Sequence, residues 1–331
     1  MLPRLVAHAD WGSNPRKRWI ACALRQAEAS YLAFAPRPVG ETGVLLDRLR
    51  QEAGLQACIL VGFDFPIGLP LAYAAQTGIT DFPKILPELG RGIWSDFYRV
   101  AESPEQIHLR RPFYPNHTGH ARQEHLWRAL GAGGMDDLRR ECERPHPGRG
   151  AAAPLFWTLG GQQVGKAAIH GWRDVLGPAL RRPDSALFLW PFDGPFFELI
   201  HPGRTVVAET YPAEVYRSLH VNLRQAARQS PPQGDAQVGP RRGKRSAACR
   251  RANTEALISW ADRAGVILAP ELRQAILDGF GPSQAGEDPF DATVGLFGML
   301  EVVLGRRLPG DPEEASIRKV EGWILGQAAE T

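Results

Sequence analysis

The feature that most constrains the fold is a strand-length apolar run at residues 5–10, which ends in Asp10 and is followed by Trp-Gly. A short apolar run bounded by turn residues is typical of a buried strand, and Gly12 with the following Ser-Asn-Pro predicts a tight turn. A carboxylate at the end of a buried strand stays ionised only when positive charge meets it. In an open α/β sheet this edge binds ligands. The alternative is that Asp10 only caps the turn.

The same pattern recurs at residues 57–64, where an apolar run ends in Asp64 and Pro66 follows. Proline cannot donate to the ladder of a central strand, so we predict that the strand ends at or just before Asp64. Between the two runs we expect two strands and then a helix, at residues 18–24, 29–34 and 41–53. This order allows the fourth strand to lie parallel beside the first, which would bring Asp10 and Asp64 together.

The rest of the chain divides into a loop-rich stretch and a second set of regular elements. Residues 71–184 hold many Gly, Pro, Trp and His residues and little periodicity, so we predict a long helical and loop insertion over the sheet edge. Further strands are predicted at 185–191, 196–200 and 204–210, and helices at 213–219, 250–264, 271–280 and 289–304. The last of these strands ends in Glu209. We therefore expect one α/β domain with its core in residues 1–70 and 185–331, although length alone would favour two domains.

Composition narrows the class of protein and its location. The 331 residues are 44% hydrophobic, which supports a large core, and the 39 basic and 36 acidic residues nearly balance. The four cysteines are widely spaced and form no Cys-x-x-Cys pair, unlike a disulfide framework or a thiolate zinc site. No apolar run is long enough to span a bilayer, and the first residues lack the apolar core of a signal peptide. We expect a cytoplasmic protein with no membrane partner.

The last predicted helix opens with two more aspartates, Asp288 and Asp291, on either side of Pro289. Asp288 has the position of an N-cap and Pro289 suits the first helical position, so capping explains Asp288. Capping explains Asp291 less well, and the apolar helix beyond it should lie on the sheet with its acidic end near a strand terminus. We therefore predict that the candidate catalytic acids form one cluster: Asp10, Asp64, Glu209, Asp288 and Asp291.

Such a group of acids needs cations, because carboxylates within a few ångströms repel one another and take up protons. Hard oxygen ligands favour Mg²⁺ or Mn²⁺. Two such ions serve phosphoryl transfer, in which one activates water and the other stabilises the leaving oxygen. We predict a metal-dependent phosphodiesterase in which Glu209 is a further ligand or a base that orients water. The predicted ligands of the two ions are Asp10, Asp64, Asp288 and Asp291.

Several patches resemble a family of uncharacterised proteins. They are Ala-Asp-Trp-Gly at 9–12, Gly-Phe-Asp-Phe-Pro-Ile-Gly-Leu-Pro at 62–70, Glu-Thr-Tyr-Pro-Ala at 209–213, Asp-Pro-Phe-Asp-Ala at 288–292 and Glu-Gly-Trp-Ile-Leu-Gly at 321–326. The family is domain of unknown function 429, which is classed as predicted RNase H-like nucleases. The resemblance implies an RNase H-like mixed sheet, with three antiparallel strands, then parallel strands, and helices on both faces.

The resemblance also implies roles for the acids, by analogy with Holliday-junction resolvases of the same fold. Asp10 would bridge two metal ions, and Asp64 would lie at the end of the adjacent strand. Asp288 and Asp291 would hold the second ion. Within the insertion the resemblance is looser, apart from basic positions such as Arg111 and Lys166.

Basic residues provide candidate contacts for a phosphate backbone. Arg and Lys crowd residues 241–251, and clustered basic side chains are typical of nucleic-acid binding, although a solvated surface is an equal alternative. We name four candidate phosphate ligands: Lys244, Arg245, Lys166 and Arg111. Residues 229–244, rich in Pro, Gly, Gln and Arg, predict a mobile loop. Nucleic acid is therefore the expected partner.

Two other functions fit the same sequence. A small-molecule phosphotransferase of the actin and sugar-kinase class elaborates this sheet, but its Gly-rich phosphate turns and duplicated half are not recognisable here. Residues 160–166 lack the Walker spacing. A non-enzymatic RNase H-like scaffold that binds nucleic acid or protein remains open, although the intact acids argue against it. A zinc site fits no standard ligand spacing; its candidate ligands are His117, His120, His125, Cys142 and His146.

Overall fold

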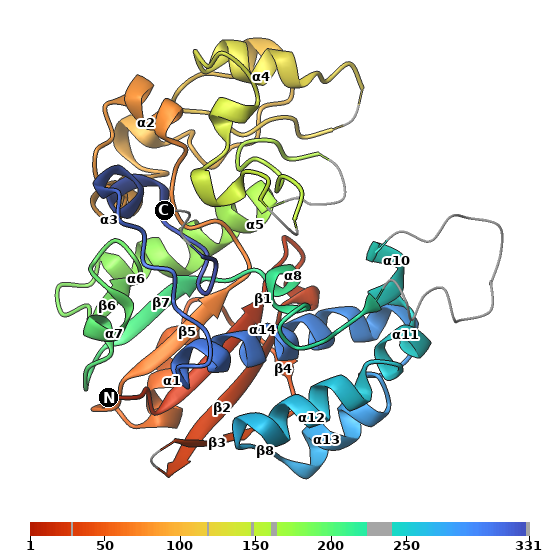
Figure 1. Ribbon diagram of the computed structural model, residues 1–331. Coiled ribbons are helices and arrows are strands. Elements are labelled where there is room, and N and C mark those ends of the chain that lie inside the picture. The colour runs from red at the N-terminus through yellow and green to blue at the C-terminus, as the bar shows by residue number, and fades with distance from the viewer. Residues whose placement is uncertain (28, 118, 147–148, 160–163, 224–239, 329–331) are drawn as a thin grey trace, which may run out of the picture.

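The structure is a computed structural model that describes residues 1–331 except 28, 118, 147–148, 160–163, 224–239 and 329–331. Its described strands form an eight-stranded sheet in the order β6-β7-β5-β1-β2-β3-β8, with β4 paired to β2 beside this path (Figure 1). The strands are β1 (Leu5–Asp10), β2 (Trp19–Ala27), β3 (Ser30–Ala33), β4 (Arg37–Pro38), β5 (Ile59–Phe63), β6 (Leu187–Leu189), β7 (Thr205–Glu209) and β8 (Val266–Leu268). Strands β1, β2 and β3 are antiparallel, whereas β5 is parallel to β1, and β7 and β6 continue in parallel. The predicted mixed α/β sheet is confirmed.

The helices fall into a group within the insertion and a group near the C-terminus. The first helix, α1 (Leu45–Ala53), precedes β5. The insertion contains α2 (Leu71–Thr77), α3 (Phe82–Ile85), α4 (Gln123–Ala129), α5 (Val164–Gly171) and α6 (Gly177–Leu180). The later helices are α7 (Phe196–Leu199), α8 (Pro212–Val215), α10 (Pro240–Arg245), α11 (Ala247–Arg251), α12 (Thr254–Ala264), α13 (Pro270–Leu277) and α14 (Glu287–Val303). None of the helices in the described part of the chain has the length and apolar character needed to cross a membrane.

Side-chain alternation divides the core between the two faces of the sheet. On β1, Leu5, Ala7 and Ala9 pack with α1 and the insertion, whereas Val6 packs on the opposite face with α14. The same alternation holds on β5 and β7, because successive side chains of a strand point to opposite faces. Figure 1 shows α14 lying across β1 and β2. The parity of a residue on these strands therefore decides whether it faces α14 or the insertion.

Two glycines allow α14 to lie close to the middle of the sheet. An added Cβ at Gly62 of β5 would overlap Met299 of α14, and one at Gly295 of α14 would overlap the ring of His8 on β1. Close packing between helix and sheet needs this lack of side chain at the crossing points. Helix α14 is consequently buried along nearly its whole length, from Pro289 to Val303.

His8 is buried under α14 in the uncharged form. Its Nδ1 lies 3.1 Å from the carbonyl oxygen of Ala292, and its Nε2 meets no hydrogen-bond partner in the described structure. Burial lowers the pKa of His8 to about 3, although the Ala292 carbonyl acts in the opposite direction. The native state therefore cannot take up the proton that an unfolded histidine binds below about pH 6.5.

This histidine should make the fold acid-sensitive. We expect the stability of the wild type relative to His8→Phe to fall by about 1.4 kcal/mol per pH unit as the pH drops from 6.5 toward 4, because only the unfolded wild type gains the proton. Urea unfolding of both proteins at several pH values measures this difference. His201→Phe, which changes an exposed histidine, should show the same pH dependence of stability as the wild type. Equal pH dependence of wild type and His8→Phe would contradict the assignment.

Two predictions about regular structure were wrong, and one strand was not predicted. Residues 196–200 were predicted as a strand, but 196–199 form helix α7 after Pro195, because a short apolar run fits either state. Strand β8, which pairs parallel to β3, was not predicted at all. Asp288 was predicted as the N-cap of the last helix, but that helix begins at Glu287 with Gly286 as its N-cap, so Asp288 lies within the first turn.

Candidate metal centre

Strands β1 and β5 place Asp10 and Asp64 side by side. Ala9 of β1 is in register with Phe63 of β5, and the backbone N–H of Asp64 donates to the Ala9 carbonyl at 3.2 Å. By alternation both aspartates point to the face covered by α14. The convergence predicted for these two strand ends is what the structure shows, and both residues remain partly exposed.

The first turns of α14 add two more acids at the same edge. Asp288 is partly exposed, whereas Asp291, one turn further along, is only 4% exposed. The negative charges of Asp291, Asp64 and Asp288 all act on Asp10. We call these four residues the carboxylate cluster: Asp10, Asp64, Asp288 and Asp291.

The electrostatics of the carboxylate cluster favour protonation. Burial raises the pKa of Asp10 well above its usual range, and the charges of the neighbouring aspartates add to this. Burial and Asp291 raise the pKa of Asp64 to about 7, and burial raises the pKa of Asp288 to about 6 although the nearby Lys17 opposes it. Carboxylates in such surroundings gain most from a cation placed among them.

Helix α10 brings two basic side chains to the cluster. The Lys244 ammonium lies 2.5 Å from Asp291 Oδ2 and 3.2 Å from Glu287 Oε1, and Arg245 pairs with Glu287 at 3.1 Å. The hydroxyl of Tyr216 donates to Asp291 Oδ1 at 2.8 Å. Both oxygens of Asp291 are therefore engaged by the chain itself.

Glu209 does not join the cluster. It ends β7 in register with Phe63, so it points to the insertion face rather than toward α14. There the guanidinium of the fully buried Arg140 binds it through two hydrogen bonds, of 2.7 and 2.6 Å, and the N–H of Ile67 donates to it at 2.7 Å. The prediction that Glu209 is a metal ligand or water-orienting base is therefore not supported by its position. It is half of a buried ion pair.

The buried ion pair of Arg140 and Glu209 belongs to a wider hydrogen-bonded network, which we call the joint. Arg140 also binds Glu143, at 3.0 Å, and the backbone carbonyls of Ile67 and Glu321. The Glu321 carboxylate in turn accepts the N–H groups of Leu71 and Glu141. The joint thus ties the insertion to β7 and to the C-terminal segment beside the cluster.

The other predicted basic ligands lie elsewhere. Arg111 donates to the carbonyls of Arg99 and Val100 within the insertion. The side chain of Lys166, on α5, makes no hydrogen bond or ion pair to a described residue. Of the predicted mobile loop at 229–244, residues 229–239 lie outside the described residues, and residues 240–244 belong to α10. Residues 160–163 are also outside them.

The five residues considered as zinc ligands lie in separate surroundings. Tyr114 contacts the His125 Nδ1 at 3.2 Å, Asn116 contacts His117, and His146 contacts Glu214. Cys142 is completely buried, whereas His120 is exposed. The structure gives these five residues no common centre.

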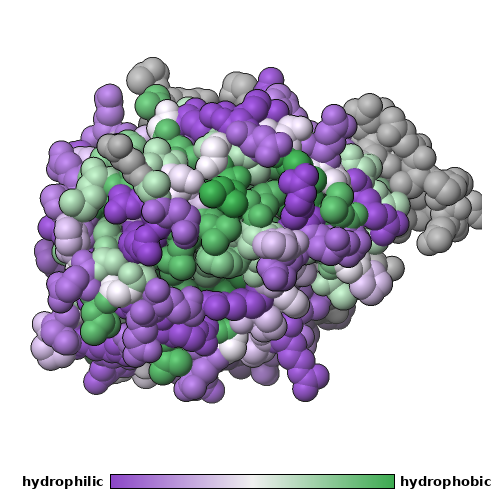
Figure 2. All heavy atoms as spheres, turned by 90° about the horizontal axis from the view of Figure 1, so that it is seen from below, coloured by the Kyte–Doolittle hydropathy of each residue, from purple (hydrophilic) through white to green (hydrophobic). Residues whose placement is uncertain are grey.

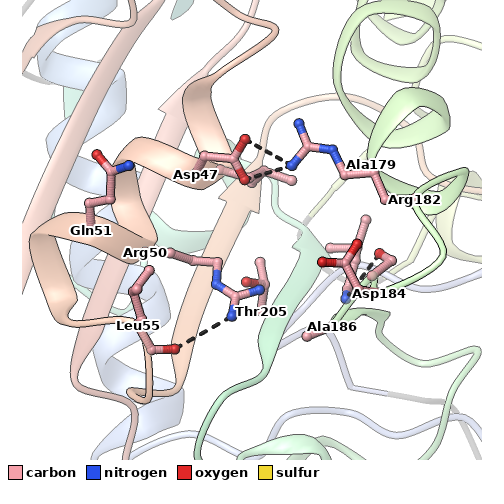
Figure 3. A pocket seen from close by; sticks show the side chains of 12 residues that line it. Asp47, Arg50, Gln51, Leu55, Ala179, Arg182, Asp184, Ala186 and Thr205 are labelled. Carbon is pink, nitrogen blue, oxygen red and sulfur yellow. Dashed lines mark hydrogen bonds and ion pairs between the residues drawn. The ribbon is translucent and has the colours of Figure 1, made fainter.

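A cavity of about 280 Å³ lies at the opposite end of the parallel strands (Figure 3). It is lined by residues of α1 and of the segment before β6, and by Thr205 at the start of β7. Asp47 accepts two hydrogen bonds from Arg182 across it, at 2.7 and 2.8 Å. From this end of the molecule, Figure 2 shows apolar side chains gathered in the middle with hydrophilic ones around them. Because charges in this cavity already pair with each other, it is a weaker candidate than the carboxylate cluster.

The residues of the cluster fit a divalent cation in their chemistry. Asp10, Asp64 and Asp288 offer hard anionic oxygens, and their carboxylates form no hydrogen bond or ion pair with any described residue. Among the described residues, no three Asp, Glu, His or Cys side chains already stand close enough to hold a metal ion. Binding an ion would therefore require these carboxylates to move together.

Comparison with family models, with curated proteins and with solved structures gave no match. Sequence reasoning missed three residues, namely Tyr216 and Lys17 at the cluster and Arg140 of the buried ion pair. Tyr216 follows the Glu-Thr-Tyr-Pro patch by a few residues, which was the one available signal. Nothing in the sequence distinguishes Lys17 or Arg140 from other basic residues.

Proposed function

We propose that the protein is a divalent-metal-dependent phosphodiesterase that acts on nucleic acid. The observation that carries this proposal is the convergence of Asp10, Asp64 and Asp288, whose carboxylates form no ion pair with a described residue and are offset only through space, by Lys244 and, at Asp288, also by Lys17. Several carboxylates held together at a ligand-binding sheet edge are costly for the fold unless a cation joins them. Mg²⁺ and Mn²⁺ are the cations that suit such ligands.

We also propose that the sheet is RNase H-like. Three antiparallel strands, β1 to β3, are followed by β5 in parallel beside β1 and by β7 in parallel beside β5, and helices cover both faces. The resemblance to domain of unknown function 429 in the sequence patches supports the same proposal. A fold alone does not assign an activity, so the nuclease proposal rests on the acids.

In this function the chain supplies charge and position. The metal would activate water and stabilise developing negative charge on the phosphate. Asp10, Asp64 and Asp288 would hold it, and the partly buried surroundings would strengthen every charge interaction there. Lys244, Arg245 and Lys17 lie at the rim of the cluster, where basic groups attract and orient the phosphate backbone.

Metal titration tests the proposal directly. Mn²⁺ at a hundred times its dissociation constant should stabilise the protein by about 2.7 kcal/mol, because it binds only the folded cluster. The melting temperature, followed with and without EDTA, measures this effect. The same samples should cleave labelled DNA, RNA or a four-way junction only when the metal is present. If Mn²⁺ neither shifts melting nor supports cleavage of any of these substrates, the proposal is wrong.

A further inference from the structure

Lys244 occupies a position among the acids that would suit a cation. Its Nζ bridges Asp291 and Glu287, at 2.5 and 3.2 Å, and its side chain is only 26% exposed. Tyr216 takes the other oxygen of Asp291. An ammonium is a compact point charge, so it neutralises these carboxylates much as an ion would.

Contacts to the backbone of residues 243 and 244 hold Lys244 in this position. Arg250, which is 1% exposed, donates to the backbone carbonyl of Lys244 and also binds the carbonyls of Gly279 and Gly281. The preceding Gly243 packs against Leu223 so closely that an added Cβ would lie 2.7 Å from the Leu223 carbonyl oxygen. A surface lysine does not need such support. These contacts hold the backbone at Lys244 in a defined position.

The carboxylates of the cluster consequently fall into two sets. Asp291 is paired with Lys244 and Tyr216, whereas Asp10, Asp64 and Asp288 have no hydrogen bond or ion pair to a described residue. The charge of Lys244 acts on the second set only through space, so these three carboxylates have no cation in direct contact. A two-ion arrangement that used Asp291 would have to displace the Lys244 ammonium from its closest contact.

We propose that Lys244 takes the place of a second metal ion, so that the site binds one divalent ion, held by Asp10, Asp64 and Asp288. This inference rests on the proposed function, because it assigns the cations of the same site. An ammonium has three N–H donors. Asp291 and Glu287 accept two of them, and the third is left for an oxygen of the substrate phosphate.

The number of Mn²⁺ ions bound by the full-length protein tests this inference. Electron paramagnetic resonance of free Mn²⁺ should give one bound ion per wild-type chain. Lys244→Met should bind two, because Asp291 and Glu287 lose the ammonium that bridges them and then offer a second position. Lys244→Arg keeps the charge and should stay at one ion. Arg245→Met, on the same short helix, is the matched control and should also stay at one.

The outcomes separate the two proposals. Two ions in the wild type, or one ion in Lys244→Met, would overturn the role of Lys244 and leave the phosphodiesterase proposal standing. No bound ion in the wild type would overturn both.

Asp291→Asn provides a second route if Lys244→Met does not fold. This variant should still bind one ion, with affinity lowered by no more than about 10–100-fold, because Asp291 acts beside the ion and not on it. Complete loss of binding in Asp291→Asn would contradict the inference.

Discussion

Asp10→Asn is expected to abolish metal-dependent cleavage and, at the same time, to raise the melting temperature of the metal-free protein. Asp10 lies at the centre of the carboxylate cluster, where three other aspartates act on it. An amide cannot replace an anionic metal ligand, and we expect a loss on the order of a thousandfold, or about 4 kcal/mol, in kcat/KM. The same amide removes a partly exposed charge that repels its neighbours, so the fold gains stability. Cleavage assays and thermal unfolding in EDTA measure the two effects.

The opposite signs of these effects make the test specific. A residue that only supports the fold would lose activity and stability together. Asp184→Asn, which changes an exposed aspartate at the far end of the sheet, should alter neither quantity. Wild-type-like cleavage by Asp10→Asn would remove the basis of the phosphodiesterase proposal, even if its melting temperature rose.

Arg140→Met is expected to cost about 3–5 kcal/mol of unfolding free energy, the largest stability effect that we predict. The substitution leaves Glu209 and Glu143 buried without the guanidinium that binds both. It also leaves the carbonyls of Ile67 and Glu321 without a donor. Urea unfolding measures the change.

A double substitution separates the lost ion pair from a general packing defect. Arg140→Met combined with Glu209→Gln should recover part of the lost unfolding free energy, because only the Glu143 carboxylate then remains buried without the guanidinium. Arg99→Met, which breaks the exposed pair with Asp96 in the insertion, should cost no more than about 1 kcal/mol. A similar cost for Arg99→Met and Arg140→Met would contradict the importance of burial.

The sequence was enough to predict that Asp10 and Asp64 converge. A strand that ends in an acid has a recognisable pattern, and parallel neighbouring strands end at the same edge of the sheet. The sequence failed for Glu209 because the same pattern does not reveal which face a residue takes. Counting along β7 shows that Val207 and Glu209 share one face and Val206 and Ala208 the other. Only the position of α14 tells which of these faces holds the site.

The rest of the site depends on contacts between segments far apart in the chain. Arg140 lies in a stretch without periodicity, and its partners are 69 and 181 residues away. Tyr216 reaches Asp291 across 75 residues. Local patterns carry no information about such pairings. Strand β8 was missed for a related reason, since its three residues form a strand only through pairing with β3.

The joint around Arg140 also constrains the order in which the molecule is assembled during synthesis. The N–H of Glu141 finds its acceptor on Glu321, which the ribosome adds 180 residues later. Until that carboxylate emerges, the middle of the nascent polypeptide holds charged groups whose native partners do not yet exist. Formation of the joint is thus a late event in synthesis.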